Sequence, residues 1–477
     1  MQAILQLELK QLLANRLLLL VGVLLLGTIG FGVYNGQQLV NEKRATIAQL
    51  KAEEGAVYRQ WQARADSVGK GLLPVGEWSE DPTNPINPGS ARWAGQYAIL
   101  PPADLALVSV GQSDIYPYYA KVSTRSKDAG RNQHSFENPF NLANGQFDLA
   151  FTLVFLLPLL IIALSYNLLS AEREGGTLKM MLSQPLQLGQ VIGAKLVFRY
   201  GLVVGIAWLG IGLALAVAGA PLGTAAFPQL LLLVALYSAF WFALAFFVNV
   251  LGKSSPTNAL LLVGAWLGFV LVIPSLANVI TNSLHPVPSR VELVTALRDA
   301  EQRVKRDQEA MLTRFYQSHP QYARKSEKEP WDWRQYYREH FLQKEAEEKL
   351  ATPVNAAFEA QLARQQALAY RYRFLSPALL LGHSLNEIAG TDTRNYLAFN
   401  QSVEDFYGEW NRYFKDKFWK EEKITAATYD RFPTYQSGAA AVAGSFGPNA
   451  LATVAFGVLF AGLGGWQLSR RRYALAI

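Results

Sequence analysis

The sequence predicts an all-α polytopic membrane protein with six transmembrane helices and a mainly helical domain outside the membrane. Hydrophobic residues make up 51% of the 477 residues, and they collect in blocks rather than spreading evenly. Charged residues make up 17% of the chain and collect between these blocks. Membrane spans that alternate with water-exposed segments produce this pattern, whereas a single soluble core does not.

Six apolar blocks are long enough to cross a bilayer, which takes about 20 helical residues. They are residues 17–34, 148–168, 192–217, 227–251, 257–280 and 448–467. The first block stands where a signal peptide would, but it is longer than the ~7–15-residue apolar core of such a peptide. Tyr34, Asn35 and Gly36, which follow it, do not form a small-x-small cleavage site. We therefore expect an uncleaved first span.

Positive charges predict the orientation, because Lys and Arg in short loops collect on the cytoplasmic side. The loop at residues 218–226, between the third and fourth spans, has no charge. The positive residues of the other short segments and of the adjoining start of the third span are Lys10, Arg16, Arg173, Lys179, Lys195, Arg199, Lys253, Arg470, Arg471 and Arg472. We expect both termini, residues 1–16 and 468–477, in the cytoplasm and the spans in a bacterial inner membrane. Residues 35–147 and 281–447 would then lie outside.

Both outer segments contain helical patterns. Residues 38–65 are rich in helix formers and extend the first span. The Pro-rich residues 81–89 are expected to be loop, since Pro removes a backbone donor and fixes φ. In the second segment apolar residues recur at helical spacing over 291–315 and over 331–372, with a break at His319 and Pro320. Two long helices with a break between them predict an antiparallel pair.

Composition and motifs disfavour several classes of function. The net charge of +7 does not indicate nucleic-acid binding, because the basic clusters lie beside apolar blocks. The chain has no cysteine, which excludes disulfides, Cys-ligated zinc and thiol catalysis, and its five histidines form no H-E-x-x-H motif. No ionisable residue falls in the middle of a predicted span, which disfavours proton-driven carriers, ion pumps and voltage sensors.

The chain has no complete nucleotide-binding motif. Gly252, Lys253 and Ser254 resemble the end of a P-loop, but Phe247 stands where that motif needs its first Gly. We interpret these residues as a charged turn on the cytoplasmic side. A transporter built in this way would take its energy from outside the spans. We expect no metal or other cofactor to be bound by this chain.

The predicted cytoplasmic loop at residues 169–191 is the most informative stretch. Charges at residues 172–174 hold its first part in water. Gly175 and Gly176 end the incoming helix, and Thr177 can cap a short new one. The apolar side of that helix would be Leu178, Met181 and Leu182, and Pro185 would stop it. Such a helix needs a partner for its apolar side; the alternative is an ordinary loop packed against its own spans.

This loop resembles the signature of ABC-2 type transporter permeases. The pattern Glu-Arg-Glu-x-Gly-Thr-Leu, followed by Leu-x-x-Pro, matches at Glu172, Arg173, Glu174, Gly176, Thr177, Leu178, Leu182 and Pro185. In that family the loop couples the permease to a separate ABC ATPase subunit, which binds ATP and Mg²⁺. The resemblance implies that these eight residues contact such an ATPase and that this chain is not itself an enzyme. The six-span plan and the amphipathic stretch at residues 1–16, which would be a connecting helix, are also similar to the family.

The outer segments are larger than in common ABC-2 permeases. In this respect the chain resembles a subfamily with a large extracytoplasmic insert, in the gliding-motility or copper-maturation branch, and residues 372–377 and 389–392 look like its recurring segments. The resemblance implies a dimer with an identical or a similar permease. Small residues permit close contact between spans, so the candidate interface is in the third span, at Gly201, Gly205, Gly210 and Gly212. Ordinary tolerance of Gly in membrane helices is the alternative.

Three functions remain open. The first is export of an unidentified substrate by an ABC-2 permease whose spans contact membrane lipid. The second is mechanotransmission, in which the ATPase cycle moves the helical pair at residues 291–372 and no cargo crosses the membrane. The third is a membrane-anchored sensor or scaffold without an ATPase.

Two aromatic clusters in the second outer segment have alternative interpretations. The first comprises Trp331, Trp333, Tyr336 and Tyr337, and the second comprises Tyr407, Trp410, Tyr413, Phe414, Phe418 and Trp419. Packing between helices is the simpler interpretation. The alternatives are a site for a lipid, a glycan or a partner protein, or, for residues 414–420, contact with the outer membrane surface.

Overall fold

The structure is a computed structural model of the whole chain. It describes Glu8 and residues 16–78, 80–89, 95–114, 116–124, 127–128, 147–178, 188–286, 290–323, 332–437 and 444–471. The chain forms two compact units. The first contains Met1–Ile273 and Phe374–Ile477, and the second contains Pro274–Arg373.

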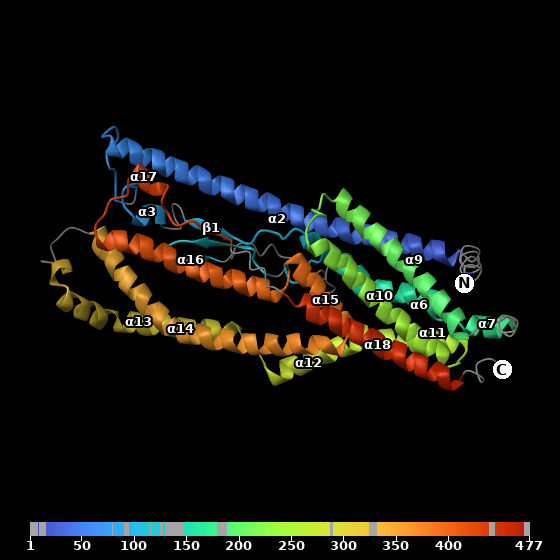
Figure 1. Ribbon diagram of the computed structural model, residues 1–477. Helices are drawn as coiled ribbons and strands as arrows, with labels where there is room; N and C mark the ends of the chain where they lie inside the picture. The colour runs from blue at the N-terminus through green and yellow to red at the C-terminus, as the bar shows by residue number, and fades with distance from the viewer. Residues whose placement is uncertain are drawn as a thin grey trace. The chain divides into compact units, whose positions relative to one another are not determined.

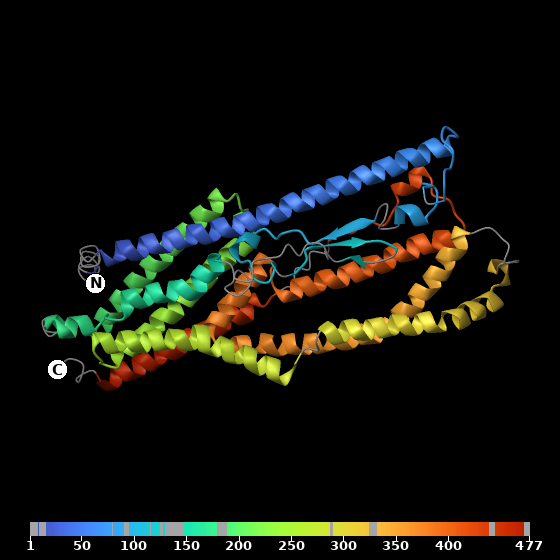
Figure 2. The same ribbon diagram turned by 180° about the vertical axis from the view of Figure 1, so that it is seen from behind.

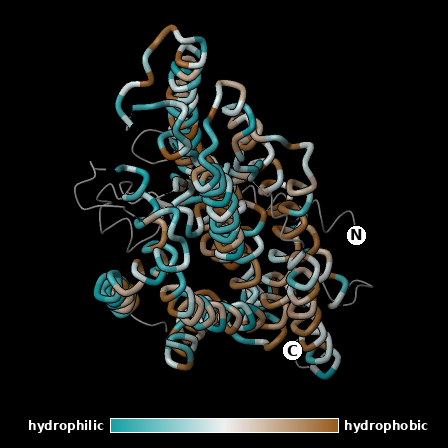
Figure 3. Tube along the Cα trace, turned by 90° about the vertical axis from the view of Figure 1, so that its left-hand side faces the viewer, coloured by the Kyte–Doolittle hydropathy of each residue, from teal (hydrophilic) through white to brown (hydrophobic). Residues whose placement is uncertain are grey.

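Six helices are long and apolar enough to cross a membrane. They confirm the predicted fold class. Four are α2 (Leu17–Gly69), α9 (Leu188–Val217), α10 (Ala226–Val250) and α18 (Phe446–Arg471). The other two are composite: α5 (Leu149–Phe151), η3 (Thr152–Leu156), α6 (Leu157–Ser165) and α7 (Ser170–Glu174) form one, and α11 (Ser255–Trp266), η4 (Leu267–Val272) and α12 (Ile273–Leu284) form the other. In Figure 3 the helices beside the C-terminus are largely brown, the colour of hydrophobic residues.

The spans of the first unit pack around α10. Tyr237, Phe240 and Trp241 of this helix are almost completely buried. α10 contacts α6, α9, α11 and α18, and α2 packs along α9. The core of the membrane part therefore lies on α10, because this helix has neighbours on several sides.

Both composite spans contain a π-helical turn, and side chains from neighbouring elements bind both turns. In η3 the carbonyl of Val154 accepts a hydrogen bond from the Tyr237 hydroxyl at 3.0 Å, and the carbonyl of Phe155 accepts one from Trp266 Nε1 at 3.1 Å. In η4 the carbonyl of Phe269 accepts a hydrogen bond from the hydroxyl of Ser376. π turns interrupt the regular hydrogen-bond ladder of a helix. These bonds fix each of the two π turns to neighbouring helices of the first unit.

The helix α2 continues far beyond the length of a membrane span. Its 53 residues extend over about 80 Å at 1.5 Å per residue, against about 30 Å of hydrocarbon. Figure 1 shows α2 as one continuous helix. Its distal part packs against a second core, in which Trp61 and Ala65 meet aromatic side chains of α16 (Thr393–Trp419). One element thus joins the membrane core to the core outside it.

The distal part of the first unit also contains a small sheet that the sequence does not predict. Strands β1 (Gln96–Ile99), β2 (Tyr119–Val122) and β3 (Lys127–Asp128) are antiparallel in the order β1-β2-β3, with Gln96 opposite Val122 and Ile99 opposite Tyr119. Strands of two to four residues give too few alternating positions for a pattern to appear. The domain is still mainly helical.

The Pro-rich residues 81–89 are not loop throughout, so this expectation needs a correction. They contain the one-turn helix α3 (Ile86–Gly89), and residues 82–89 are buried. The carbonyls of Pro82 and Gly89 accept hydrogen bonds from Tyr429 of α17 (Ala426–Tyr429) at 2.9 Å and from Trp410 at 3.1 Å. The missing donors of the prolines do not matter here, because the segment is held through its carbonyls.

Of the second aromatic cluster, Trp410 and Phe414 are buried in this distal core, and Phe418 is buried as well. Packing is therefore the correct interpretation for these three residues.

The segments at residues 372–377 and 389–392 define the two ends of helix α15 (Pro377–Ala389). Ser376 caps its start by accepting the N–H of Ala378 at 3.1 Å. Gly390, at φ 65°, ends it in the left-handed conformation that favours glycine. Asp392 then caps α16 by accepting the N–H groups of Arg394 and Asn395 at 2.9 and 3.2 Å. These residues have a structural role, since they fix where one helix ends and the next begins.

The second unit contains the predicted antiparallel pair, α13 (Arg290–Ser318) and α14 (Trp333–Tyr372). The Tyr316 hydroxyl of α13 donates to Glu339 of α14 at 2.8 Å, and near the other end of α14 Gln365 donates to Asn282 of α12, shortly before α13 begins, at 2.7 Å. The short helix η5 (Pro320–Tyr322) follows α13, at the predicted break. The helix η6 (Arg373–Leu375) follows α14. Trp331, from the first aromatic cluster, lies outside the described residues.

Replacing Pro353 with alanine should straighten α14 and stabilise the pair. Pro353 lies inside this 40-residue helix, and Figure 2 shows α14 bending along its length. An interior Pro removes a backbone hydrogen bond and costs about 3 kcal/mol, so Pro353→Ala is expected to recover part of this amount. Distances between spin labels at residues 340 and 365 should lengthen. An unchanged distance would show that packing, rather than Pro353, causes the bend.

Candidate functional site

The residues that resemble the ABC-2 signature form a tight bend after the second span, which we call the elbow (residues 170–178). Helix α7 carries Glu172, Arg173 and Glu174. Gly176 has φ 72°, a conformation that L side chains rarely adopt, and it allows the chain to reverse. Leu182 and Pro185 lie outside the described residues. We call the end of the membrane part that carries the elbow the elbow end.

Two of the three charged side chains bind the turn between α10 and α11. The Arg173 guanidinium donates to the carbonyls of Gly252 and Lys253 at 2.7 and 2.8 Å. The Glu174 carboxylate accepts the N–H and the hydroxyl of Ser255 at 2.7 and 2.8 Å. A carboxylate at this position also interacts favourably with the positive end of the α11 dipole. The turn that resembles a P-loop end is therefore a partner of the elbow.

The third charged side chain belongs to a cluster of four ionised groups. Lys195 of α9 lies between two carboxylates, at 2.7 Å from Glu172 and 3.3 Å from Glu8. Arg199, one turn further along α9, donates through Nε to Glu8 at 2.6 Å and also binds the Leu164 carbonyl. Thr177 of the elbow donates to Glu172 as well. Two positive and two negative charges balance in this cluster.

Burial makes the cluster important for stability. Glu8, Lys195 and Arg199 are only 1%, 4% and 8% exposed. Ionised groups removed from water need partners, since an unpaired buried charge costs several kcal/mol. The cluster therefore joins Glu8 to the elbow and to α9. Sequence reasoning noted Arg199 and Lys195 only as charges that orient the spans and did not connect them with Glu172.

A polar residue that the sequence analysis missed binds the backbone just before the elbow. Asn249 of α10, which is 1% exposed, donates to the Ser165 carbonyl at 2.9 Å and accepts the N–H of Leu169 at 3.2 Å. Ser170 and Ser255 share a hydrogen bond of 2.7 Å. The available signal was a lone Asn in an otherwise apolar span. These contacts connect α6, α7, α10 and α11 with one another at the elbow end.

The elbow has an inner and an outer face. Leu178 is 3% exposed and packs with Leu169, Leu188, Ile192 and Val250. Its apolar side chain thus contacts this chain's own spans, as the alternative interpretation of the loop expects. Ala171, Glu174, Gly175, Gly176 and Thr177 are exposed. These five residues form the outer face of the elbow, which is available to another molecule.

Comparison with known proteins agrees with this geometry. Residues 124–282, which include the elbow and its α10–α11 partner turn, match the family described as ABC-2 family transporter protein. Over these residues the chain is thus similar to ABC-2 family transporter proteins. Residues 290–437 match a domain of unknown function, DUF3526. This second match is consistent with the large insert predicted from the sequence, and the resemblance to ABC-2 permeases is confirmed.

One relative has a functional name. The probable ABC transporter permease protein NosY of Stutzerimonas stutzeri is 33% identical over 133 residues, which are 26% of this chain and 48% of the relative. The chain thus spans about half the length of this curated relative. No solved structure matches.

The four glycines of the predicted dimer interface lie in the residues that match the ABC-2 family. They differ in how closely other parts of the chain approach them. A Cβ on Gly210 would lie 2.7 Å from Leu26 and 3.3 Å from Ile29, so this glycine accommodates α2 of the same chain. Gly201, Gly205 and Gly212 have no atom within 4 Å of such a Cβ. These three leave an open face on α9.

Among the described residues, no group of three or more His, Asp or Glu side chains is placed to hold a metal ion. The charged groups of the ABC-2 domain at the elbow bind backbone and one another. The arrangement connects the elbow to α9 and to the α10–α11 turn.

Proposed function

We propose that this chain is the membrane-spanning subunit of an ABC-2 type transporter, driven by a separate ABC ATPase that binds the outer face of the elbow. The observation that supports this role is the attachment of the elbow to the spans. Arg173 and Glu174 bind the α10–α11 turn, and Glu172 binds α9. A displacement of the elbow by the ATPase would therefore move several spans together.

The remaining features of the assembly follow from this role. ATP and Mg²⁺ would bind to the ATPase and not to this chain. The elbow end and both termini would face the cytoplasm of a bacterial inner membrane. A second permease, identical or similar, would pack on the open face of α9 at Gly201, Gly205 and Gly212, because small residues permit close approach of helices.

Mechanotransmission is the second candidate, and α2 favours it. This helix runs without interruption from the membrane core to the distal core, where Trp61 packs. A shift of the first span would reach the distal domain along one rigid element. The chain lacks cysteine, so a spin label can be attached to a cysteine introduced at the exposed Leu72, just beyond α2. Movement of this label on ATP addition, with no cavity through the assembled spans, would favour mechanotransmission over export.

The ATPase-docking proposal is tested by Ala171→Arg. Ala171 is exposed on the elbow, and an arginine there would obstruct a docked partner. Steric overpacking costs about 1–3 kcal/mol, so recovery of the proposed ABC ATPase partner should fall about ten-fold when both are co-expressed and purified.

Ala45→Arg, on an exposed position of α2 away from the elbow, is the matched control and should recover the ATPase normally. Glu174→Ala should leave the complex assembled but lower its ATP turnover, because it loosens the α10–α11 turn without adding bulk. Equal recovery of the ATPase with Ala171→Arg and Ala45→Arg would show that the elbow is not the docking site.

A further inference from the structure

The helix α15 packs with the membrane spans although it is not one of them. Ala378, Leu381 and Leu385 belong to the same hydrophobic core as the spans. The helix contacts α10 and α18, and Figure 1 shows it beside both. Its 13 residues extend over about 20 Å, too short to cross about 30 Å of hydrocarbon. An apolar helix of this length is either a core helix outside the membrane or a re-entrant segment, which enters and leaves the bilayer on one side.

The start of α15 lies beside the middle of the spans. The Ser376 hydroxyl, directly before α15, binds the Phe269 carbonyl in η4, midway along the composite span Ser255–Leu284. The Phe269 ring lies 5.5 Å from the Phe240 ring of α10 and 6.3 Å from the Phe456 ring of α18. These three rings therefore mark the level at which α15 begins.

The ends of the spans at the elbow give the depth of this level. Phe269 lies 14 residues after Ser255, where α11 begins, and this stretch extends over about 21 Å. Phe456 lies 14 residues before Arg470, near the end of α18, which is again about 21 Å. Because the hydrocarbon is about 30 Å thick, the level lies about 9 Å inside its far side. Tilt of the spans would place it deeper.

The polarity of α15 changes along its length in the direction that this depth requires. Its first six residues, 377–382, are Pro-Ala-Leu-Leu-Leu-Gly and have no polar side chain. Farther along, Ser384 accepts a hydrogen bond from Asn449 of α18 at 2.9 Å. Glu387 then accepts the N–H of Ser445, directly before α18 begins, at 3.1 Å. The two helices are thus antiparallel, and polar contacts begin where α18 starts.

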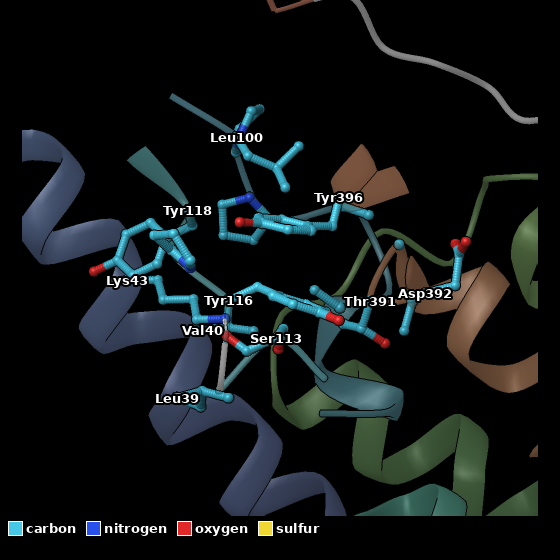
Figure 4. Close-up of a pocket in the computed structure, with 17 residues that line it drawn as sticks. Leu39, Val40, Lys43, Leu100, Ser113, Tyr116, Tyr118, Thr391, Asp392 and Tyr396 are labelled. Carbon is cyan, nitrogen blue, oxygen red and sulfur yellow. Dashed lines mark hydrogen bonds between the residues drawn. The ribbon is translucent and has the colours of Figure 1, made fainter. Parts of the chain in front are cut away.

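Charged and hydroxyl side chains surround the chain just after α15. Figure 4 shows Thr391 and Asp392 on the wall of a pocket, across from Lys43 of α2. The Thr391 carbonyl accepts the N–H of Gln112 at 3.4 Å, and the Thr393 hydroxyl donates to the Gln112 side chain at 2.7 Å. Charged side chains are costly in hydrocarbon, so α15 leaves the apolar layer before Thr391.

Two large apolar side chains are exposed at the deep end of α15. Phe374 and Leu375, directly before Ser376, are 41% and 50% exposed. The preceding Arg373 donates to the Tyr370 carbonyl at 2.5 Å, and its guanidinium lies 3.3 Å from the Tyr370 ring. Its charge is thus bound at the last turn of α14, in the way that arginines near an apolar layer reach back to polar groups. The exposed pair itself is entirely apolar.

We propose that α15 is a re-entrant helix and that Phe374 and Leu375 contact the acyl chains of the leaflet opposite the elbow. Both side chains lie within two residues of Ser376, at a level where the spans face lipid. Irregular backbone at this depth needs hydrogen-bond partners. Ser376 supplies them, because it caps α15 and binds a carbonyl of the π turn η4. The contact with lipid does not depend on an ATPase partner.

Spin labels on the full chain in phosphatidylcholine vesicles test this proposal. The chain has no cysteine, so one label can be attached at Leu375→Cys. Its collisions are measured with oxygen, which concentrates among acyl chains, and with a nickel chelate, which stays in water. The ratio of oxygen to nickel collisions should exceed that of a Leu72→Cys label, just beyond α2, about ten-fold or more, because moving a polar solute into hydrocarbon costs at least that factor.

Val458→Cys is the matched label at the same depth. It is 65% exposed on α18, two residues from Phe456, and should give a ratio similar to that of Leu375→Cys. All three positions are exposed, so the labelled chains should unfold at the temperature of the parent. As many nickel collisions at Leu375 as at Leu72 would show a turn in water and overturn the proposal. Few collisions of either kind at Leu375 would show that protein covers the turn, which would overturn it as well.

Discussion

Replacing Arg199 with methionine should lower the free energy of unfolding by about 3–5 kcal/mol, the cost of breaking a buried ion pair from one side. Among the described residues, the substitution would leave Glu8, which is 1% exposed, with Lys195 at 3.3 Å as its charged partner. It would also remove the donor to the Leu164 carbonyl. The change can be measured by chemical unfolding in mixed micelles, with helix content as the signal.

A double-mutant cycle separates the ion pair from the loss of packing. Glu8→Gln alone should also destabilise the protein, because it leaves two cations near one carboxylate. Glu8→Gln together with Arg199→Met restores the balance of charges, so the double variant should lose less than the sum of the single changes. Such non-additivity is expected for residues in direct contact. Strictly additive losses would show that the two side chains stabilise the fold independently.

A matched control uses the two lysine pairs of this chain. Lys195 is almost buried, whereas Lys305 pairs with Glu301 at 2.6 Å on an exposed helix face. Exposed pairs contribute little, because water and salt screen them. Lys195→Met should therefore be strongly destabilising, and Lys305→Met should leave the unfolding curve unchanged. Similar losses for both variants would contradict the importance of burial at the cluster.

The cluster also shows what could not be predicted from the sequence. The elbow was found because three charged residues follow an apolar block and resemble a known signature. Its partners were not found, because Lys195 is 23 residues from Glu172 and Glu8 is 191 residues from Arg199. Periodicity and charge placement act over one or two turns of a helix, whereas these contacts depend on how the spans pack.

The spans and the helical pair α13–α14 were predictable for the same physical reason. Each is long, and each repeats one chemical pattern over many turns, so a single local signal is enough. The short strands β1 and β2 have four residues each, and α3 is a single turn within a Pro-rich segment. Their conformation is decided by partners such as Trp410, which binds the Gly89 carbonyl. A local pattern cannot contain that information.

The glycines of the first span are a signal that the sequence analysis did not use. Four glycines in the third span drew attention, although only Gly210 has a close neighbour in the chain. Gly32 and Gly36 of α2 have the four-residue spacing that allows two backbones to approach. A Cβ on Gly32 would lie 2.7 Å from the Asp148 carbonyl group, and one on Gly36 would meet the Leu107 carbonyl. Gly32 and Gly36 of α2 thus permit close backbone packing within the chain, whereas the predicted contact of Gly201, Gly205 and Gly212 with a second permease stays a prediction.

Gly36→Ala should therefore destabilise the protein by about 1–3 kcal/mol, the usual cost of forcing extra volume into a packed interior. The obstacle is backbone: the added methyl group would lie 2.8 Å from the Leu107 carbonyl carbon and still closer to its oxygen. Leu107 belongs to the helix η1 (Ala106–Val108), where Val108 is buried as well. The helix α2 and η1 must move apart, because no side-chain rotation can relieve the contact.

Gly27→Ala and Gly30→Ala are the matched controls, since both glycines lie in α2 and have no atom within 4 Å of an added Cβ. Alanine is the better helix former by about 0.5–1 kcal/mol, so these variants should keep or raise stability as Gly36→Ala lowers it. Thermal unfolding in the same detergent compares all three. If Gly36→Ala resembled the controls, η1 would not be firmly packed on α2. The opposite signs expected for one substitution in one helix arise because Gly36, unlike Gly27 and Gly30, faces the backbone of another segment.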